Sequence, residues 1–332
     1  MPDKYEIKYG CTTESLNPDA DGEFVWNQVG GNGWQHPWIY NSRYAILIGG
    51  DIHPEKKDTG EYQPDVSLPA FWNDVKDMYN TLVGKGFVDD DVDYFGTEDD
   101  HIVVLFWDGT KGDGSVPSII DNAASVTTVR MALNTFSTKV TKNDLFLFVA
   151  ISHGGASLFR MRTDEDAQPH HCRYGYPPEY LADYEMNISE INVVPYSRSI
   201  VIIQACNSGG AIRNRREIGT DGGTEWRTFT PLMAEDRIIV GSSRVDKDSS
   251  TISGNAHWKF IHSFISKLGS GDVSVKAAFD SGKSAAGNEL PQLEDNGDAL
   301  CEQNTDPNIG VNGEYVPGYV YNDGLMTSYT YI

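Results

Sequence analysis

The sequence has few basic residues and few cysteines, and each shortage excludes a class of protein. Lys and Arg number 26 against 48 Asp and Glu, which gives a formal net charge of −22 over 332 residues. Such a chain repels phosphate backbones, so we expect no nucleic-acid partner. The 4 cysteines are widely scattered and form no CxxC pair, so neither a zinc ribbon nor a disulfide framework is indicated.

Long apolar runs are also missing. No segment approaches the roughly 18 uncharged apolar residues of a membrane span, so no span is expected. Residues 1–10 contain no apolar segment of the kind found in signal peptides. The compartment is left open, although the many Asn, Gly, Tyr and Trp residues are typical of exported microbial proteins.

Motifs for phosphate binding and for metal-dependent hydrolysis are absent as well. GGNG at 30–33 does not lead from a strand into a helix, and neither GKS nor GKT occurs, which disfavours a nucleotide-binding protein. There is no HExxH, and the five-residue spacing of His257 and His262 does not place both on one helical face. The run His170-His171-Cys172 is interpreted as a solvated loop.

The chain does contain apolar strands that alternate with amphipathic helices. This alternation predicts an α/β fold with a mostly parallel, doubly wound sheet. The predicted strands lie in 44–50, 101–109, 144–155, 199–210 and 237–243, and the predicted helices in 71–87, 121–140 and 254–268.

The rhythm of strands and helices is confined to residues 43–268, which we predict to be one catalytic domain. Residues 1–42 are rich in Gly, Asn, Asp and Trp and are expected to form an extension packed on that domain. Residues 269–332 are rich in Asp, Asn and Gly and are expected to form a C-terminal extension.

Two of the predicted strands end in chemically competent residues. FLFVAISHGG ends at His153, and SIVIIQACNSGG ends at Cys206. The carboxyl ends of parallel strands share one edge of a sheet, where ligands bind, so the imidazole and the thiol are expected to lie side by side. A thiol next to a base is the arrangement that nucleophilic catalysis by cysteine requires.

Glycines follow both residues and fit the same chemistry. The amide N–H groups of Gly154 and Cys206 are expected to converge on a developing oxyanion, where each donor is worth about 3 kcal/mol. Gly209 and Gly210 permit a tight exit from the strand into a following helix, whose start would favour the thiolate of Cys206.

These blocks resemble the His-Gly and Ala-Cys motifs of the caspase-like cysteine peptidases, and most closely those of the bacterial legumain-like members. YAILIGG, NDVKDMYNTLVGKGF and IVVLFWDG are similar to the first strand, first helix and second strand of that group, so the resemblance covers residues 43–268. It implies a three-layer α/β/α sandwich around a six-stranded, mostly parallel sheet. It also implies endopeptidase activity through a Cys206–His153 dyad.

The resemblance leaves the specificity open. Residue 204 matches the S1 wall position, where legumains have Glu, clostripain-like enzymes Asp and caspases Gln; this chain has Gln204. Residues 67–74 contain no arginine for a caspase-like or legumain-like pocket. The other wall is expected from residues 242–255, with Ser242, Arg244, Asp246, Asp248 and Asn255 as the candidates. Neither Asn nor Asp specificity follows.

Two further residue roles are predicted. Asp51, just after the first strand, is the candidate that orients His153, although a loop carboxylate is an equal alternative. Asn17, Asp19 and Asp21 copy the first half of a calcium loop, but residue 28 is Gln where that loop needs Glu. We therefore expect no required cofactor, with calcium as a structural or activating ion left open.

We expect a protein or peptide substrate, and the oligomeric state is left open with a monomer favoured. Self-cleavage within 213–227 is a further hypothesis. Two alternatives are retained. One is an idle caspase-like scaffold that binds proteins, which would need neither His153 nor Cys206. The other is a flavodoxin-like or Rossmann nucleotide binder, which lacks its phosphate loop here.

Overall fold

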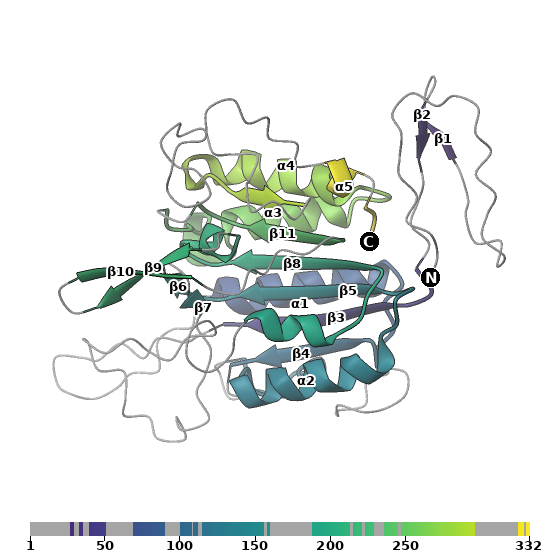
Figure 1. Ribbon diagram of the computed structural model, residues 1–332, viewed down its shortest axis with the longest axis horizontal. Helices are drawn as coiled ribbons and strands as arrows, with labels where there is room; N and C mark the ends of the chain where they lie inside the picture. Colours follow the sequence, from purple (N-terminus) through teal and green to yellow (C-terminus); the bar gives the residue numbers. More distant parts are fainter. Residues whose placement is uncertain are drawn as a thin grey trace.

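The computed structural model in Figure 1 describes most of the predicted domain and parts of the flanking segments. The described residues are 27–29, 33–35, 40–50, 69–89, 100–107, 109–111, 115–155, 158–159, 188–212, 215–220, 223–228, 236–244, 247–295, 325–328 and 330–332. The candidate calcium ligands Asn17, Asp19 and Asp21 lie outside these residues.

A six-stranded sheet forms the centre of the fold, in the order β12-β11-β8-β5-β3-β4 (Figure 1). Five strands pair in parallel, and the edge strand β12 pairs antiparallel to β11. The strands are β3 (Arg43–Gly49), β4 (Ile102–Phe106), β5 (Leu145–Ile151), β8 (Arg198–Gln204), β11 (Arg237–Gly241) and β12 (Gln292–Glu294). All five strand predictions are therefore confirmed, and the sixth strand implied by the resemblance is β12.

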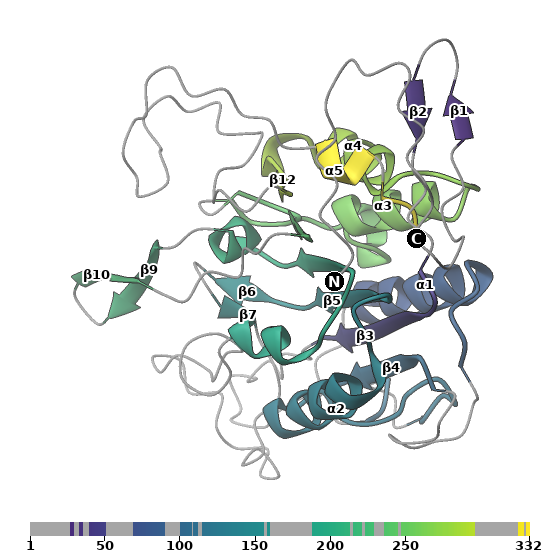
Figure 2. The ribbon, with the colours of Figure 1, turned by 45° about the vertical axis from the view of Figure 1, so that its right-hand side comes forward.

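Helices cover both faces of the sheet, as Figures 1 and 2 show. One hydrophobic core lies beneath α1 (Pro69–Gly84), α3 (Lys259–Leu268) and α4 (Val275–Ala286), and the other beneath α2 (Val126–Lys139) and the 3-10 segment η1 (Ile188–Val193). Successive strand residues point to opposite cores: Leu147 and Val149 to the first, Phe146 and Phe148 to the second. Because both faces are buried, the strands are continuously apolar. The predicted three-layer α/β/α sandwich is confirmed.

The remaining elements of the described residues are short. They are the strand pairs β1 (Asn27–Val29) with β2 (Gly33–Gln35), β6 (Gly154–Gly155) with β7 (Leu158–Phe159), and β9 (Arg215–Thr220) with β10 (Gly223–Thr228), the 3-10 segments η2 (Ser208–Ala211), η3 (Ser253–Asn255) and η4 (Gly287–Glu289), and the short helix α5 (Leu325–Ser328). Within the described residues, no helix has both the length and the apolar character needed to cross a bilayer.

The sheet and its covering helices continue past residue 268. Helix α4 packs on α3 and buries Phe279, while β12 closes one edge of the sheet. The last residues join them: Thr327 N–H donates to Asp295 Oδ2 at 2.7 Å, and Val275 N–H donates to the carbonyl of Thr330 at 2.8 Å. The domain boundary at 268 stays a prediction, but 275–294 form part of the same packed unit.

The order of the strands places a switch point between β3 and β5. From β3 the chain moves to β4 on one side, then returns past β3 to β5 and continues through β8 and β11 on the other side. In open α/β sheets the crevice at such a point, outside the carboxyl ends of the strands, is where ligands bind. The fold therefore directs attention to the residues that follow β3, β5 and β8.

The contact between α3 and α4 gives a test of packing. A methyl group on Gly282 would lie 2.7 Å from the fully buried Phe260 ring and 3.0 Å from the Phe260 carbonyl oxygen, whereas one on Gly84 meets nothing within 4 Å. Alanine gains up to about 1 kcal/mol of helix propensity over glycine, and overpacking costs about 1–3 kcal/mol. We expect Gly282→Ala to lower the free energy of unfolding and the matched Gly84→Ala to leave it equal or higher, measured by urea denaturation. Equal stabilities in the two variants would contradict this packing.

Candidate active site

His153 and Cys206 lie at the same edge of the sheet, beyond two neighbouring strands. Ile151 of β5 and Gln204 of β8 are directly paired, and Ser152 N–H donates to the Gln204 carbonyl at 3.0 Å. Each candidate follows its paired residue by two positions. Because neighbouring strands are about 4.8 Å apart, the in-register pairing brings the backbones of the two residues close together.

Aromatic rings hold the imidazole of His153. Phe71 from α1 lies with its ring centroid 5.0 Å from that of His153 at an interplanar angle of 72°, and Trp258 lies 6.3 Å away at 89°. Such edge-to-face contacts are favourable and restrict the ring. Gly50, at the end of β3, permits the close approach of Phe71: its φ is +37°, and a side-chain carbon there would lie 2.7 Å from Phe71 Cβ.

A cluster of serines fixes the peptide just before the cysteine. The carbonyl oxygen of Ala205 accepts hydrogen bonds from three hydroxyl groups, at 3.2, 3.0 and 3.0 Å, which belong to Ser242, Ser243 and Ser249. The amide of Ala205 also donates to Ser242 Oγ at 3.1 Å. We call Ser242, Ser243 and Ser249 the serine cluster. With both polar groups of its neighbour held, Cys206 starts from a rigid backbone position.

The thiol itself is half-buried and unoxidised. Cys206 is a free cysteine, and its sulfur lies 3.9 Å from the Ser249 carbonyl oxygen. Burial raises the pKa of the thiol above its ordinary value, the Ser249 contact lowers it, and the negative charges of Asp248 and Glu289 raise it again. Burial and the two carboxylates therefore favour the thiol form of Cys206 over the thiolate.

The predicted helix after the cysteine is wrong. Asn207 adopts the left-handed conformation with φ 59° and is followed only by the four-residue 3-10 segment η2. Gly209 N–H donates to the Ser243 carbonyl at 2.8 Å, which ties the chain to the end of β11. So short a segment has no appreciable macrodipole, and the net shift of the cysteine pKa is upward instead of downward.

Gly154 and Cys206, whose amides are the predicted oxyanion donors, follow β5 and β8 at the same edge of the sheet. Gly154 follows His153 directly and opens β6, and among the described residues no hydrogen-bond partner is found for the Cys206 amide. The proposed orienting residue Asp51 lies outside the described residues.

Comparison with known proteins identifies the fold family. The family model of the caspase domain, a group of cysteine peptidases, matches residues 43–292. This chain belongs to the caspase-domain family. The predicted caspase-like membership is thereby confirmed, whereas the closer likeness to legumain-like members stays a prediction.

The other comparisons add little to the caspase-domain match. The crystal structure of protein GSU0716 from Geobacter sulfurreducens is similar at 13% identity, with 76% of this chain and 92% of that chain covered and a TM-score of 0.45. No curated protein matches this sequence.

In this caspase domain, the residues predicted to line S1 make several different contacts. Gln204 is fully buried and faces α3, where its Oε1 accepts the Ile261 N–H at 3.2 Å. Its Nε2 has no partner among the described residues. Ser242 is fully buried within the serine cluster.

The remaining S1 candidates come from the segment after β11. Arg244 donates its amide N–H to the Glu289 carbonyl at 2.8 Å, and exposed Asn255 accepts a hydrogen bond from Thr251 Oγ1 at 2.6 Å. Asp246 lies outside the described residues. The S1 assignments of Gln204, Ser242, Arg244, Asp246 and Asn255 stay predictions.

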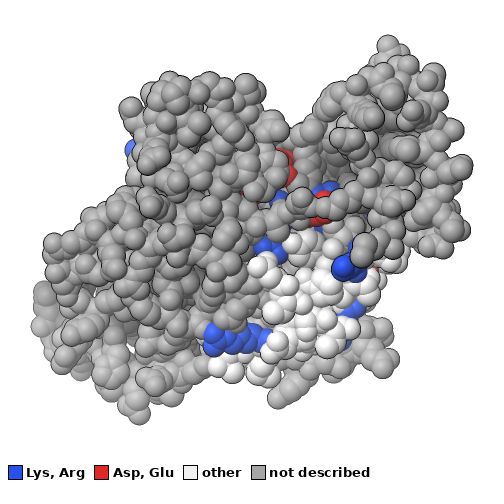
Figure 3. Space-filling model, in the orientation of Figure 1, with Lys and Arg blue, Asp and Glu red and all other residues white. Residues whose placement is uncertain are grey.

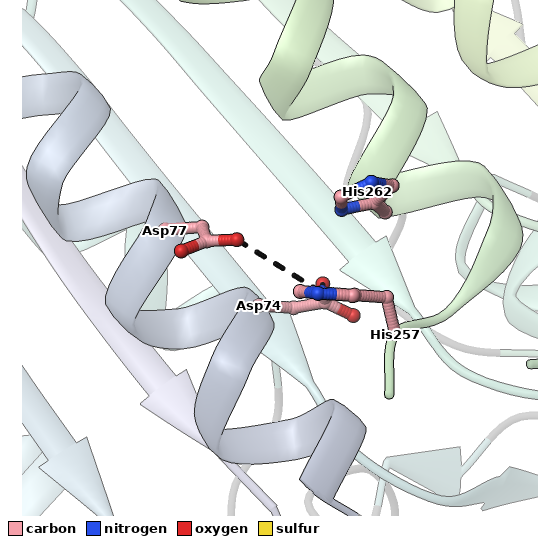
Figure 4. Close-up of side chains that lie close together, drawn as sticks. All are labelled: Asp74, Asp77, His257 and His262. Atoms are coloured by element: carbon pink, nitrogen blue, oxygen red, sulfur yellow. Dashed lines mark hydrogen bonds and ion pairs between the residues drawn. The ribbon is translucent and has the colours of Figure 1, made fainter. Parts of the chain in front are cut away.

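A second group of ionisable side chains lies next to Trp258, and Figure 4 shows its four members together. We call Phe71 and Trp258, the two rings that contact His153, the aromatic wall. Asp74 and Asp77 come from α1. His257 comes from the turn before α3, and His262 from the first turn of α3. The spacing of the two histidines in the sequence did not predict that they lie together. His257 precedes the helix, and its ring centroid lies 4.1 Å from that of His262. No local sequence signal joins residues from α1 to residues some 180 positions later.

Burial shifts two pKa values in this group. It raises the pKa of Asp74 to about 8, with the Trp258 N–H opposing the shift and the charge of Asp77 adding to it. Burial also lowers the pKa of His262, as does the nearby His257. A hydrogen bond of 2.6 Å joins His257 Nδ1 to Asp74 Oδ1.

The environment of the thiol yields a prediction about its reactivity. Alkylation by iodoacetamide requires the thiolate, so its rate at Cys206 should rise with a midpoint at higher pH than that of an ordinary thiol, about 8.5. Asp248→Asn removes a negative charge that disfavours the thiolate and should move the midpoint to lower pH. The matched change Asp280→Asn, at an exposed residue of α4, should leave the midpoint unchanged. Mass spectrometry of the Cys206 peptide measures the rate, and equal midpoints in the two variants would contradict the assigned cause.

Proposed function

We propose that this protein is a cysteine endopeptidase in which Cys206 is the nucleophile and His153 the acid and base. One observation carries the proposal: in a caspase-domain chain, both residues follow paired positions of the adjacent strands β5 and β8. A protein or peptide is the expected substrate.

The chemistry follows from these positions. His153 accepts the thiol proton as the sulfur of Cys206 attacks the carbonyl carbon of the scissile bond, and a tetrahedral oxyanion forms. The amide N–H groups of Gly154 and Cys206 stabilise that oxyanion. The C–N bond then breaks, His153 gives the proton to the leaving amine, and an acyl-enzyme remains. Water, deprotonated by His153, attacks the thioester and releases the carboxylic acid and the thiol.

The raised pKa of Cys206 fits this sequence of proton transfers. Because burial and the nearby carboxylates favour the thiol form, a base is needed to remove its proton during the attack, and we assign this role to His153. Phe71 and Trp258 restrict the imidazole on its apolar side. Asp51 is retained as the proposed orienting residue.

The alternative, an idle caspase-like scaffold for protein binding, has less support. Binding alone requires neither a thiol at the open edge of the sheet nor an Ala205 peptide held by the serine cluster. On the face seen in Figure 3, the described Lys and Arg residues are scattered instead of gathered into one patch.

No cofactor is needed for the proposed reaction. Calcium at Asn17, Asp19 and Asp21 remains a hypothesis about regulation. Self-cleavage within 213–227 also remains a hypothesis; this segment contains β9 and most of β10, an antiparallel pair that directly follows the η2 region.

The charges around the sulfur favour basic residues at P1. The two side chains whose charges act on the Cys206 sulfur, Asp248 and Glu289, are both carboxylates, and Asp248 is exposed. A negative field attracts a cationic substrate side chain and repels an acidic one. We therefore propose Arg or Lys at P1, ahead of Asp.

Active-site labelling tests the endopeptidase. A peptidyl acyloxymethyl ketone should modify the wild-type protein once, at Cys206, and the His153→Ala variant should lose this labelling. Cys206→Ala should lower kcat/KM for peptide hydrolysis by at least about a thousandfold, and His153→Ala by about 10²–10⁴-fold. Cys172→Ser serves as the matched control. Full hydrolysis by the Cys206→Ala protein would rule out this function.

A positional peptide library tests the proposed P1 preference. We expect kcat/KM to be at least tenfold higher with Arg or Lys at P1 than with Asp, and Asp248→Asn to narrow that ratio because it removes one attracting charge. Hydrolysis that favours Asp at P1 would refute the preference while leaving the peptidase assignment intact.

A further inference from the structure

Helix α1, helix α3 and the turn before α3 place four metal-ligating side chains together, apart from the thiol site. One ligand atom from each of Asp74, Asp77, His257 and His262 lies within 4.8 Å of the others. Figure 4 shows the two carboxylates on α1 directed toward the two imidazoles at the start of α3. We propose that these four residues form a binding site for a divalent transition-metal ion, with Zn²⁺ as the representative ion.

The ligand types select this class of ion. Two imidazoles and two carboxylates are a donor set that Zn²⁺ and its first-row neighbours prefer, whereas Ca²⁺ and Mg²⁺ prefer oxygen ligands alone. Metal–ligand bonds of about 2.0–2.2 Å separate the ligand atoms of one tetrahedral Zn²⁺ ion by roughly 3.3–3.6 Å. The observed spread of up to 4.8 Å therefore closes with small side-chain rotations.

The site is reachable from solvent and is supported from behind. The His257 and Asp77 side chains are 18% and 37% exposed, which leaves a path for an ion, while Asp74 is fully buried. Asp74 Oδ2 accepts the Trp258 N–H at 2.8 Å, which orients its other oxygen toward His257. Hydrogen bonds of this outer kind orient metal ligands and strengthen binding.

The proton of a hydrogen bond between two of the proposed ligands would have to leave when the ion binds. His257 Nδ1 and Asp74 Oδ1 are 2.6 Å apart, a hydrogen-bond distance, and Asp77 Oδ2 lies 3.9 Å from the same nitrogen. Binding of the ion would replace that proton, which leaves to solvent, and would form one bond to each side chain without any change of oxidation state.

The position of the site gives the ion a structural consequence. The ion would join α1 to the turn that carries Trp258, whose ring contacts His153. The Asn73 side chain already links the same two segments, donating to the Ala256 carbonyl at 2.9 Å. A bound ion would thus reinforce the contact that positions the aromatic wall.

Zinc titration of the Cys206→Ala protein tests the proposal without any contribution from the active-site thiol or from peptidase activity. After removal of metals with EDTA and dialysis, isothermal calorimetry with Zn²⁺ should give one site per chain, and Zn²⁺ should raise the Tm. His262→Gln and Asp77→Asn, each added to Cys206→Ala, should weaken binding at least about tenfold and remove the Tm shift. Ca²⁺ should show no binding that depends on His262.

Two control variants separate this site from other sources of affinity. Zn²⁺ affinity should be unchanged by Asp280→Asn, which removes an exposed carboxylate of α4. It should also be unchanged by the double change His170→Gln and His171→Gln. The proposal is overturned by the absence of Zn²⁺ binding, by unchanged binding in both His262→Gln and Asp77→Asn, or by its loss in the His170 and His171 variant. The first two outcomes would reduce the group to a hydrogen-bonded His–Asp pair between helices.

Discussion

The pairing of β5 with β8 is the interaction on which the rest of the site depends. These strands run in parallel, in register over their full lengths, and both are buried on both faces. A slip of one residue would send every side chain of one strand to the opposite core, so the register is strongly fixed. That fixed register pairs Ile151 with Gln204, so His153 and Cys206 each leave the same edge of the sheet two residues beyond a paired position.

The surroundings of the two residues differ, and the difference suits their proposed roles. Cys206 extends from a peptide held by the serine cluster at the end of β11, so its backbone is rigid while its thiol stays partly open. His153 is held through its ring by Phe71 and Trp258, contacts that restrict the tilt of the imidazole. Burial of the thiol raises its pKa, which gives the imidazole a proton to remove.

Helix α1 links the apolar and the ionisable parts of this region. Its Phe71 reaches the imidazole at the edge of the sheet, and one turn later Asp74 reaches His257, next to Trp258. Residues three apart on a helix share a face, so the placement of α1 sets both the contact of Phe71 with His153 and that of Asp74 with His257. The aromatic wall and the cluster behind it are therefore mechanically coupled, whether or not an ion bridges the cluster.

Local patterns in the sequence predicted five of the six strands of the sheet, the helices α1, α2 and α3 and the His and Cys that follow two strands, because burial on both faces demands continuous apolar runs; they did not predict α4. They also indicated the caspase-like family. The sequence could not reveal the edge strand β12, whose three residues QLE carry no apolar run, nor the 3-10 turn in place of a helix after Asn207. Only the tertiary structure decided that the Ser242 hydroxyl is hydrogen-bonded to the backbone of Ala205. It alone also decided that α1 packs near the start of α3, so that two aspartates face two histidines. Those contacts join residues far apart in the chain, and their partners are set by packing between layers, which no local periodicity records.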